Sequence, residues 1–346
     1  MTQSGIAGEI TITAVLEAGC VRRITIASDR PVSLLSTMLG RPVAAAAASV
    51  AALHGLCGQS HAAAVHFAAA AATGEPLSDA DAAAWIVRLA GERLAEHVRG
   101  LFTAGTVTAP PQEADIAAAR EAIVIGQHVA RHAEVTANHA ARLAHALHAL
   151  GVDNASGWAA RQGALPPTHP VPVDSLRTQD DAAVVTALAE SPDFVRSPHL
   201  PGRCPETGPA ARHAWSAADP AAATAARLLE IQEACRLLVR HAAQPLLTPP
   251  PGWIVAAPLG DRTAYAAVET PRGRLFYRLT VNHAGELRHA RVLAPTEWNF
   301  AADGPFARSL IGLRCGDSPQ TEITNRAAAF DPCVAFRVAV EEQSDA

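Results

Sequence analysis

Residues 41–74 read RPVAAAAASVAALHGLCGQSHAAAVHFAAAAATG, a stretch in which alanine dominates and no proline follows Pro42. Alanine has the highest helix propensity, and a proline is tolerated in the first turn of a helix. The stretch therefore predicts a helix over residues 41–72, closed by the glycine at its end. Gly55 and Gly58 could interrupt this helix, because glycine weakens a helix interior.

Further helical patterns follow along the chain. Ser78 is a typical N-cap for a helix that runs to about Arg99 and carries acidic residues in its first turn. A long helix is predicted over residues 112–150 and another over residues 220–243. We therefore expect a helical core over residues 41–150.

The long helix predicted over residues 112–150 is rich in histidine. Pairs four residues apart, such as His128 and His132, could bind a metal from one helix face. Surface or packed histidines are the favoured interpretation. The five are His128, His132, His139, His145 and His148.

Both ends of the chain carry patterns that are typical of β-strands, and the N-terminal one alternates apolar and polar residues. In residues 1–28 two such runs predict a β-hairpin that turns near Ala18 and Gly19. From residue 253 the segments WIVAAPL, TAYAAVET, GRLFYRLTV and LRHARVLAP predict short strands, with a turn at His283-Ala284-Gly285. We expect residues 253–346 to be β-rich.

Residues 164–220 are rich in proline, serine, aspartate and threonine. They predict a long irregular connection, packed on the surface, with one helix near residues 179–190. No repeat and no linker divides the chain. The sequence therefore predicts a single domain over residues 1–346, of mainly helical α+β class, with small sheets from its N- and C-terminal regions.

The composition excludes several classes of protein. The chain has 346 residues, of which 49% are hydrophobic and 18% charged, as in folded globular proteins. A net charge of −5 and the lack of a basic stripe argue against nucleic acid as a partner. The apolar run at residues 43–53 is too short to span a bilayer, and the N-terminus lacks the pattern of a secretory signal. We expect a cytoplasmic protein with no membrane insertion.

Cysteine usage indicates thiols and not disulfides. Six cysteines are scattered without any Cys-x-x-Cys pair, and a cytoplasmic chain keeps its thiols reduced. Each is therefore a buried small residue or a metal ligand, and the sequence assigns no role to four of them. The six are Cys57 and Cys333, discussed below, and Cys20, Cys204, Cys235 and Cys315.

The familiar catalytic motifs are absent: there is no phosphate loop, dinucleotide fingerprint, His-Glu-x-x-His or Gly-x-Ser-x-Gly. The segment His54-Gly-Leu-Cys57-Gly-Gln-Ser-His61 instead gathers one thiol and two imidazoles where glycines interrupt the helix. These groups suit iron or nickel, and glycine lets a backbone approach a bulky cofactor. An incidental grouping remains the alternative.

Three other segments carry notable side chains. Asp331-Pro332-Cys333 places a thiol after a proline that favours a turn. Glu269-Thr-Pro271-Arg272-Gly and Ala294-Pro-Thr296-Glu-Trp-Asn place a guanidinium and a hydroxyl beside rigidifying prolines. Taken singly, each of these segments is a weak signal.

Taken in order, these features resemble the large subunit of nickel–iron hydrogenases over nearly the whole chain. That family opens with a strand pair and then carries Arg-x-Cys-Gly-x-Cys-x-x-x-His, Pro-Arg-Gly, Pro-[Ser/Thr]-x-Trp-Asn and Asp-Pro-Cys-x-x-Cys-x-x-His. In this chain Cys57 matches a bridging cysteine, His61 the motif histidine, and Cys333 a nickel-terminal cysteine. The resemblance implies that Cys57 and Cys333 are metal ligands.

The departures from the family pattern argue against an enzyme. His54 stands in place of one cysteine, Phe336 in place of another, and Ala339 in place of the closing histidine. The family binds nickel with four thiolates, so the resemblance implies that a stable nickel–iron centre should not form here, although His54 could supply a nitrogen ligand. The processing signal of the finished subunit is also missing.

The groups around the iron are retained. In the family, arginine and a hydroxyl bind the cyanides of an Fe(CN)2(CO) fragment, and Pro271, Arg272 and Thr296 match those positions. The chain thus resembles hydrogenase expression/formation accessory proteins of the HupK and HoxV type. That resemblance implies a scaffold that holds the fragment transiently and passes it on, with maturation factors and the hydrogenase large subunit as partners.

Two other functions remain open from the sequence. The chain could be a divergent redox-active subunit in which His54 replaces a thiolate, or a metal-free paralogue that only binds maturation factors. A redox subunit would need an electron path, and the chain offers no cysteine clusters for iron–sulfur centres.

Overall fold

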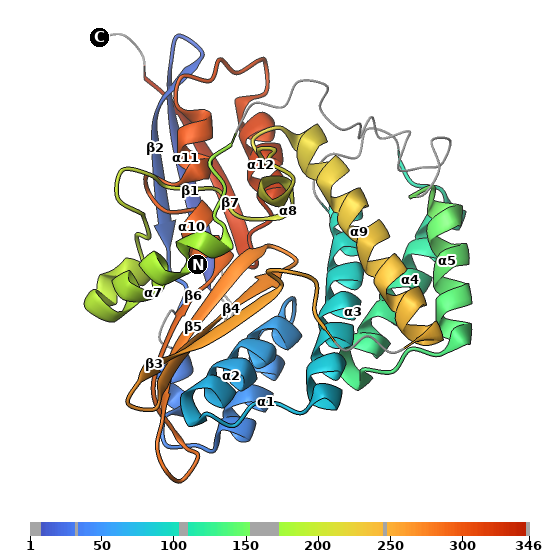
Figure 1. The fold of residues 1–346 in the computed structure, drawn as a ribbon. Helices are drawn as coiled ribbons and strands as arrows, with labels where there is room; N and C mark the ends of the chain where they lie inside the picture. The colour runs from blue at the N-terminus through green and yellow to red at the C-terminus, as the bar shows by residue number, and fades with distance from the viewer. Residues whose placement is uncertain (1–7, 32–33, 104–109, 153–172, 245–247, 344–346) are drawn as a thin grey trace.

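The computed structural model describes residues 8–31, 34–103, 110–152, 173–244 and 248–343 (Figure 1). It has the predicted mainly helical α+β fold, with two small sheets beside a group of long helices. Within these residues no helix is both long and apolar enough to cross a membrane.

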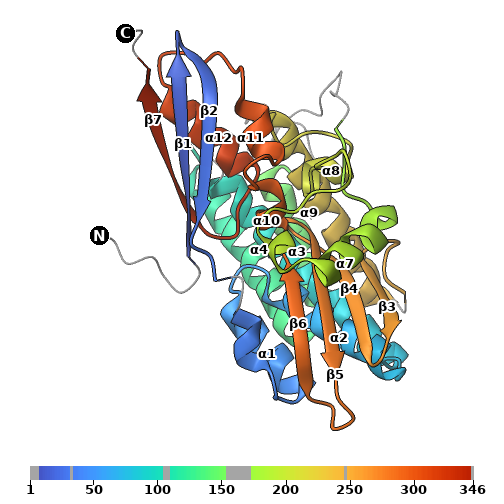
Figure 2. The ribbon, with the colours of Figure 1, turned by 90° about the vertical axis from the view of Figure 1, so that its left-hand side faces the viewer.

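The predicted hairpin is present and gains a third strand from the other end of the chain. Strands β1 (Glu9–Glu17) and β2 (Cys20–Ser28) are antiparallel, and β7 (Ala335–Glu342) pairs with β1 in parallel (Figure 2). Ala18 and Gly19 form the turn with positive φ. The C-terminal strand is an addition to the predicted elements.

The register of this sheet brings two distant segments together. Ile10 on β1 pairs with Ser28 on one side and with Phe336 on the other. The end of β2 and the start of β7 therefore lie at the same end of the sheet. The chain that leaves β2 and the chain that enters β7 emerge side by side.

The alanine-rich helix is interrupted where its glycines predict. Helix α1 (Val43–Leu53) ends at His54 and α2 (Gly58–Thr73) begins after Cys57. A Cβ on Gly58 would lie 2.2 Å from the carbonyl oxygen of Ala51, so only glycine permits this close return of the chain.

The second sheet has the order β3-β4-β5-β6 and all its pairs are antiparallel. Both faces are covered, with Tyr277 in the core shared with α2 and Phe276 in the core shared with α7. Two covered faces explain the continuous apolar runs in the strands. The elements are β3 (Ile254–Gly260), β4 (Thr263–Thr270), β5 (Gly273–Val281), β6 (Leu287–Leu293) and α7 (Asp181–Glu190).

Four long helices pack together on the side away from the hairpin (Figure 1). Gly91 and Gly126 lie at the crossing of α3 and α4, where a Cβ on either glycine would fall within 3 Å of the other's carbonyl oxygen. The two backbones therefore approach more closely than larger side chains would allow. The helices are α3 (Asp79–Thr103), α4 (Glu113–His132), α5 (Ala137–Leu150) and α9 (Pro220–Ala243).

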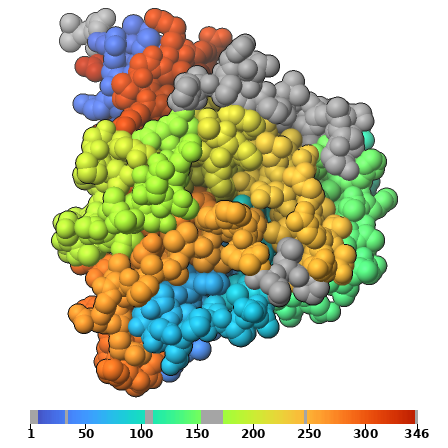
Figure 3. Space-filling model, in the orientation of Figure 1, coloured from blue at the N-terminus to red at the C-terminus, as the bar shows by residue number. Residues whose placement is uncertain are grey.

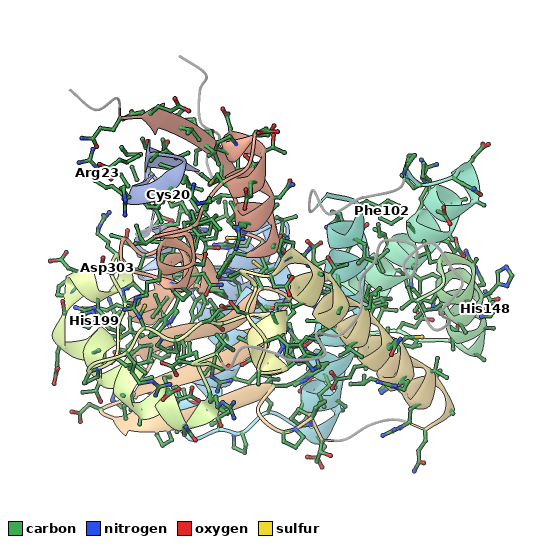
Figure 4. The ribbon with its side chains drawn as sticks, turned by 90° about the horizontal axis from the view of Figure 1, so that it is seen from above. Cys20, Arg23, Phe102, His148, His199 and Asp303 are labelled. Atoms are coloured by element: carbon green, nitrogen blue, oxygen red, sulfur yellow. The ribbon has the colours of Figure 1, made fainter. Side chains whose placement is uncertain are left out.

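The prediction of one unbroken helix over residues 112–150 is wrong. Ala133 adopts a left-handed conformation that ends α4, and Thr136 caps α5 by accepting a hydrogen bond from the backbone N–H of His139 at 3.1 Å. The break brings His139 of α5 against His128 of α4, which also contacts His132 one turn further along the same helix. His148, at the end of α5, lies on the opposite side of the molecule from Cys20 in the hairpin (Figure 4).

The connection predicted over residues 164–220 contains short helices and is in part buried; its residues 164–172 lie outside the described residues. The expectation that it packs on the surface is wrong at Thr207, which is buried because its hydroxyl accepts from Arg274 N and its own N–H donates to Asn299. Its visible part lies against the second sheet (Figure 3). Besides α7 it forms η2 (Thr178–Asp180), η3 (Pro192–Val195) and α8 (Pro209–Arg212).

Short helices complete the fold around the junction of the two sheets. Helix α10 (Pro295–Asn299) directly follows β6 and carries Thr296 and Glu297. The others are η1 (Leu34–Met38), α11 (Pro305–Leu310) and α12 (Pro319–Ala329).

Candidate functional site

Cys57 and Cys333 line a single cavity of about 460 Å³. His54 and His61 also line it, so four of the residues singled out in the sequence come together although they derive from opposite ends of the chain. The wall is otherwise mostly apolar, with the exceptions of Arg30, Glu297 and Tyr277. An apolar cavity with a few polar groups is typical of a ligand-binding site.

The turn between α1 and α2 positions Cys57, and a carboxylate on α3 holds that turn. Glu92 accepts hydrogen bonds from the backbone N–H groups of Gln59 and Ser60, at 2.7 and 3.0 Å, and from the Ser60 hydroxyl. These bonds satisfy N–H groups that the first turn of α2 leaves free. Burial nevertheless raises the pKa of Glu92 to about 7.

Cys57 itself is buried, with 6% of its surface exposed. Burial raises the pKa of its thiol well above the ordinary value, and the neighbouring Cys333 and Glu92 add to this effect. The positive charge of Arg272 opposes it. The two thiols and the arginine thus lie close enough to affect one another electrostatically.

The two histidines of the motif stack on each other. Their ring centroids are 3.7 Å apart and the rings are 15° from parallel. His54 Nδ1 donates to the Val50 carbonyl at 2.9 Å, and His61 Nδ1 lies 2.6 Å from the Tyr277 hydroxyl. Burial lowers the pKa of both histidines, so both are neutral near pH 7.

His54 does not complete a metal site with the two thiols. Throughout the part of the chain that the structure describes, no three His, Cys, Asp or Glu side chains are arranged to hold a metal ion. The histidines of α4 and α5 are included in this result.

Cys333 lies in the turn before β7, where Asp331 adopts a positive φ. Its sulfur accepts hydrogen bonds from Thr296 Oγ1 and Arg30 Nη2, both at 3.2 Å. Its backbone N–H in turn donates to Thr296 Oγ1 at 3.2 Å. Thr296 therefore contacts Cys333 directly and fixes the position of the thiol.

Arg30 is a site residue that the sequence analysis missed. It follows β2 and meets Cys333, which precedes β7, because both segments leave the same end of the first sheet. Its guanidinium also forms an ion pair with Glu297 on α10. No motif or spacing marks Arg30, since the contact depends on the parallel pairing of β1 with β7.

Arg272 occupies the turn between β4 and β5 and is not among the residues that line the cavity. Its guanidinium donates to Glu96 at 3.3 Å and to Asp331 at 3.4 Å. Burial alone would lower the pKa of Arg272, but the charges of these carboxylates and of the two thiols raise it above its ordinary value. Pro271 precedes it in the same turn and does not line the cavity.

A buried ionic network holds the turn that carries Arg272. Glu230 on α9 binds Arg93 at 2.6 Å and Arg212 at 2.7 Å. Arg212 extends the network to the Glu269 carboxylate at 2.8 Å and the Thr270 carbonyl at 3.3 Å. The turn is thereby fixed to the helical group by charged hydrogen bonds.

Phe336 and Ala339, which stand where the hydrogenase family has a cysteine and a histidine, both lie in β7. Phe336 packs against the core beneath the first sheet, and neither residue lines the cavity.

Comparisons with known proteins find relatives that match almost the whole chain. The hydrogenase expression/formation protein HupK of Rhizobium leguminosarum bv. viciae is 30% identical, and the match covers 98% of this chain and 98% of that protein. HupK of Bradyrhizobium diazoefficiens is likewise 30% identical over 98% of both chains. No protein-family model matches the chain.

Solved structures show the same fold at low sequence identity. The Ni-Fe-Se hydrogenase from Desulfomicrobium baculatum has a TM-score of 0.64 at 14% identity and covers 92% of this chain and 95% of its own. An NAD+-reducing [NiFe]-hydrogenase has a TM-score of 0.61 at 15% identity and covers 91% and 93%. With a hydrogenase-like fold and full-length sequence relatives of one kind, the chain belongs to the HupK family of hydrogenase expression/formation proteins.

Proposed function

We propose that this protein is a non-catalytic accessory protein of hydrogenase maturation. In this role it holds an Fe(CN)2(CO) fragment transiently through Cys57 and Cys333 and passes it to the hydrogenase large subunit. The observation that supports the proposal is that these two thiols, from opposite ends of the chain, line one cavity in a HupK family member.

The number of protein ligands suits this cargo better than a bare metal ion. Two thiols are available, and no three His, Cys, Asp or Glu side chains in the described ranges are arranged as a metal site. A fragment that brings three carbon ligands of its own needs fewer protein ligands than a bare ion. We expect nickel not to be bound, since Phe336 and His54 replace two thiolates of the family.

An unused hydrogen-bond donor near the thiols suits an anionic cargo. Metal-bound cyanides require donors when they are buried, because an unpaired charge in an apolar cavity is costly. The Nε of Arg272 is buried and has no hydrogen-bond partner, although both of its Nη atoms are bonded. One donor close to the thiols is therefore unused.

The proposal is tested by infrared spectroscopy of protein produced together with the hydrogenase maturation machinery. We expect cyanide and carbonyl stretching bands in the wild type, and their loss with the bound iron in Cys57→Ala and in Cys333→Ala. Cys204→Ala is the matched control, since this thiol is buried to a similar extent, with 7% exposed, and lines a different cavity.

Each result has a clear meaning. A wild-type sample without such bands, or bands that persist in both Cys57→Ala and Cys333→Ala, would refute the proposed function. Nickel bound in stoichiometric amount together with hydrogen turnover would instead support a redox subunit. A sample free of metal that still binds maturation factors would support a metal-free paralogue.

Delivery is tested by mixing the loaded protein with large subunit that lacks its metal centre. We expect the cyanide and carbonyl bands to move from this protein to the large subunit after the two are separated. Bands that remain entirely on this protein would contradict the transfer step.

A further inference from the structure

Two arginines beside the thiols share an unusual feature. Among the described residues, the buried side-chain nitrogens that lack a hydrogen-bond partner include the Nε atoms of both Arg30 and Arg272. In each guanidinium the Nη atoms are occupied, by Glu297 and Cys333 in Arg30 and by Glu96 and Asp331 in Arg272. A buried donor without a partner is costly, so it often marks a place where a ligand binds.

Arg30 is held rigidly at the cavity. Its side chain is 13% exposed and lines the cavity wall together with Cys57 and Cys333. One Nη contacts the Cys333 sulfur at 3.2 Å, while the ion pair with Glu297 fixes the other. The Nε–H takes part in neither contact, so a ligand that comes within reach of it would leave both contacts in place.

The hydroxyl of Thr296 is already committed to Cys333. It donates its hydrogen to the Cys333 sulfur and accepts from the Cys333 backbone N–H. A hydroxyl carries a single hydrogen, so in this arrangement Thr296 cannot also donate to a cyanide. The resemblance to the hydrogenase enzymes implies that one of the two cyanides binds the hydroxyl at the position of Thr296. If Thr296 donates to Cys333 instead, this cyanide has no donor.

We propose that Arg30 supplies this donor: its guanidinium binds one cyanide of the iron fragment, Arg272 binds the other, and Thr296 positions Cys333. This inference rests on the proposed function. The ligand that Arg30 recognises is a metal-bound anion with a terminal nitrogen acceptor. Each guanidinium, although already paired with carboxylates, would give one cyanide a charge-assisted hydrogen bond.

The test compares infrared spectra and iron content of the loaded wild type, Arg30→Lys, Arg30→Gln and Thr296→Val. Arg23→Gln is the matched control, because it removes one positive charge from the exposed side of the hairpin (Figure 4). Thermal unfolding confirms that each variant is folded. Lysine keeps the charge of Arg30 but cannot reproduce its fixed fork of donors.

We expect Arg30→Lys to shift one of the two cyanide bands more than the carbonyl band. Arg30→Gln should reduce iron retention about tenfold or more, as the loss of a hydrogen bond between charged groups does. Thr296→Val should lower iron content through Cys333 and leave the cyanide bands of the remaining fraction in place.

Bands and iron content that are unchanged in both Arg30 variants would overturn the inference and leave the proposed function intact. A cyanide band that moves in Thr296→Val but in neither Arg30 variant would overturn it as well. A wild type without any cyanide band would refute the proposed function itself, and the role of Arg30 with it.

Discussion

Replacement of Glu230 by glutamine tests whether the buried ionic network holds the Arg272 turn. Glu230 is 2% exposed and binds Arg93 at 2.6 Å and Arg212 at 2.7 Å. Removal of one partner from a buried ion pair costs about 3–5 kcal/mol, because the remaining charges stay buried. We expect Glu230→Gln to lower the free energy of unfolding by about that amount, measured by urea denaturation with an unchanged m-value.

A surface ion pair of the same length is the matched control. Glu17 binds Arg22 at 2.7 Å, but the two side chains are 41% and 57% exposed. Exposed pairs contribute about 0–1 kcal/mol, so Glu17→Gln should change the free energy of unfolding by less than about 1 kcal/mol. Equal effects of Glu17→Gln and Glu230→Gln would show that the buried network does not anchor the turn.

Two further predictions concern the helical group and the turn below Cys57. Gly91→Ala should lower the free energy of unfolding by about 1–3 kcal/mol, because the new Cβ would fall 2.6 Å from the Gly126 carbonyl oxygen. Gly316→Ala is the control: its Cβ meets no atom within 4 Å, so it should change the free energy of unfolding by no more than about 0.5 kcal/mol. Similar values for the two glycine variants would contradict the close helix crossing. Burial raises the pKa of Glu92 to about 7 from an ordinary 4.5. The protonated Glu92 therefore contributes fully to the free energy of unfolding below about pH 4.5, and this contribution is lost as the pH rises through 7. This difference in pKa corresponds to about 3 kcal/mol. The difference in unfolding free energy between wild type and Glu92→Gln should change by that amount between pH 4.5 and 8. Parallel curves of unfolding free energy against pH for the two proteins would show that Glu92 is not protonated in the fold.

Local patterns were sufficient to predict most elements. The hairpin, the helix interrupted near Gly55 and Gly58, helix α9 and the four strands of the second sheet all follow from propensity, period and turn residues. The break at Ala133 was not predicted, because alanine rarely adopts the left-handed conformation and only the tertiary packing selects it here.

Only the site residues that belong to a sequence motif could be predicted. Cys57, His54, His61 and Cys333 were identified in the sequence and line one cavity. Arg30 was not, since its contact with Cys333 depends on a parallel pairing between the two ends of the chain, which no local pattern encodes.

The residues that support the site could not be predicted from local sequence patterns either. Glu92 lies within the regular helix α3, where a charged residue normally faces solvent, yet it is buried against the first turn of α2. The hydrogen bond from the Thr296 hydroxyl to the Cys333 sulfur is likewise known only from the structure. Sequence motifs thus identified the proposed ligands, and the structure identified the groups that contact them.

The central claim is that two thiols of this protein bind the iron of the fragment. X-ray absorption at the iron edge, on protein loaded by the maturation machinery, counts the sulfur neighbours of the metal directly. We predict two sulfur neighbours in the wild type and at most one around any iron that Cys57→Ala or Cys333→Ala retains. An iron atom with no sulfur neighbour, or with the same number in both variants as in the wild type, would contradict the assignment.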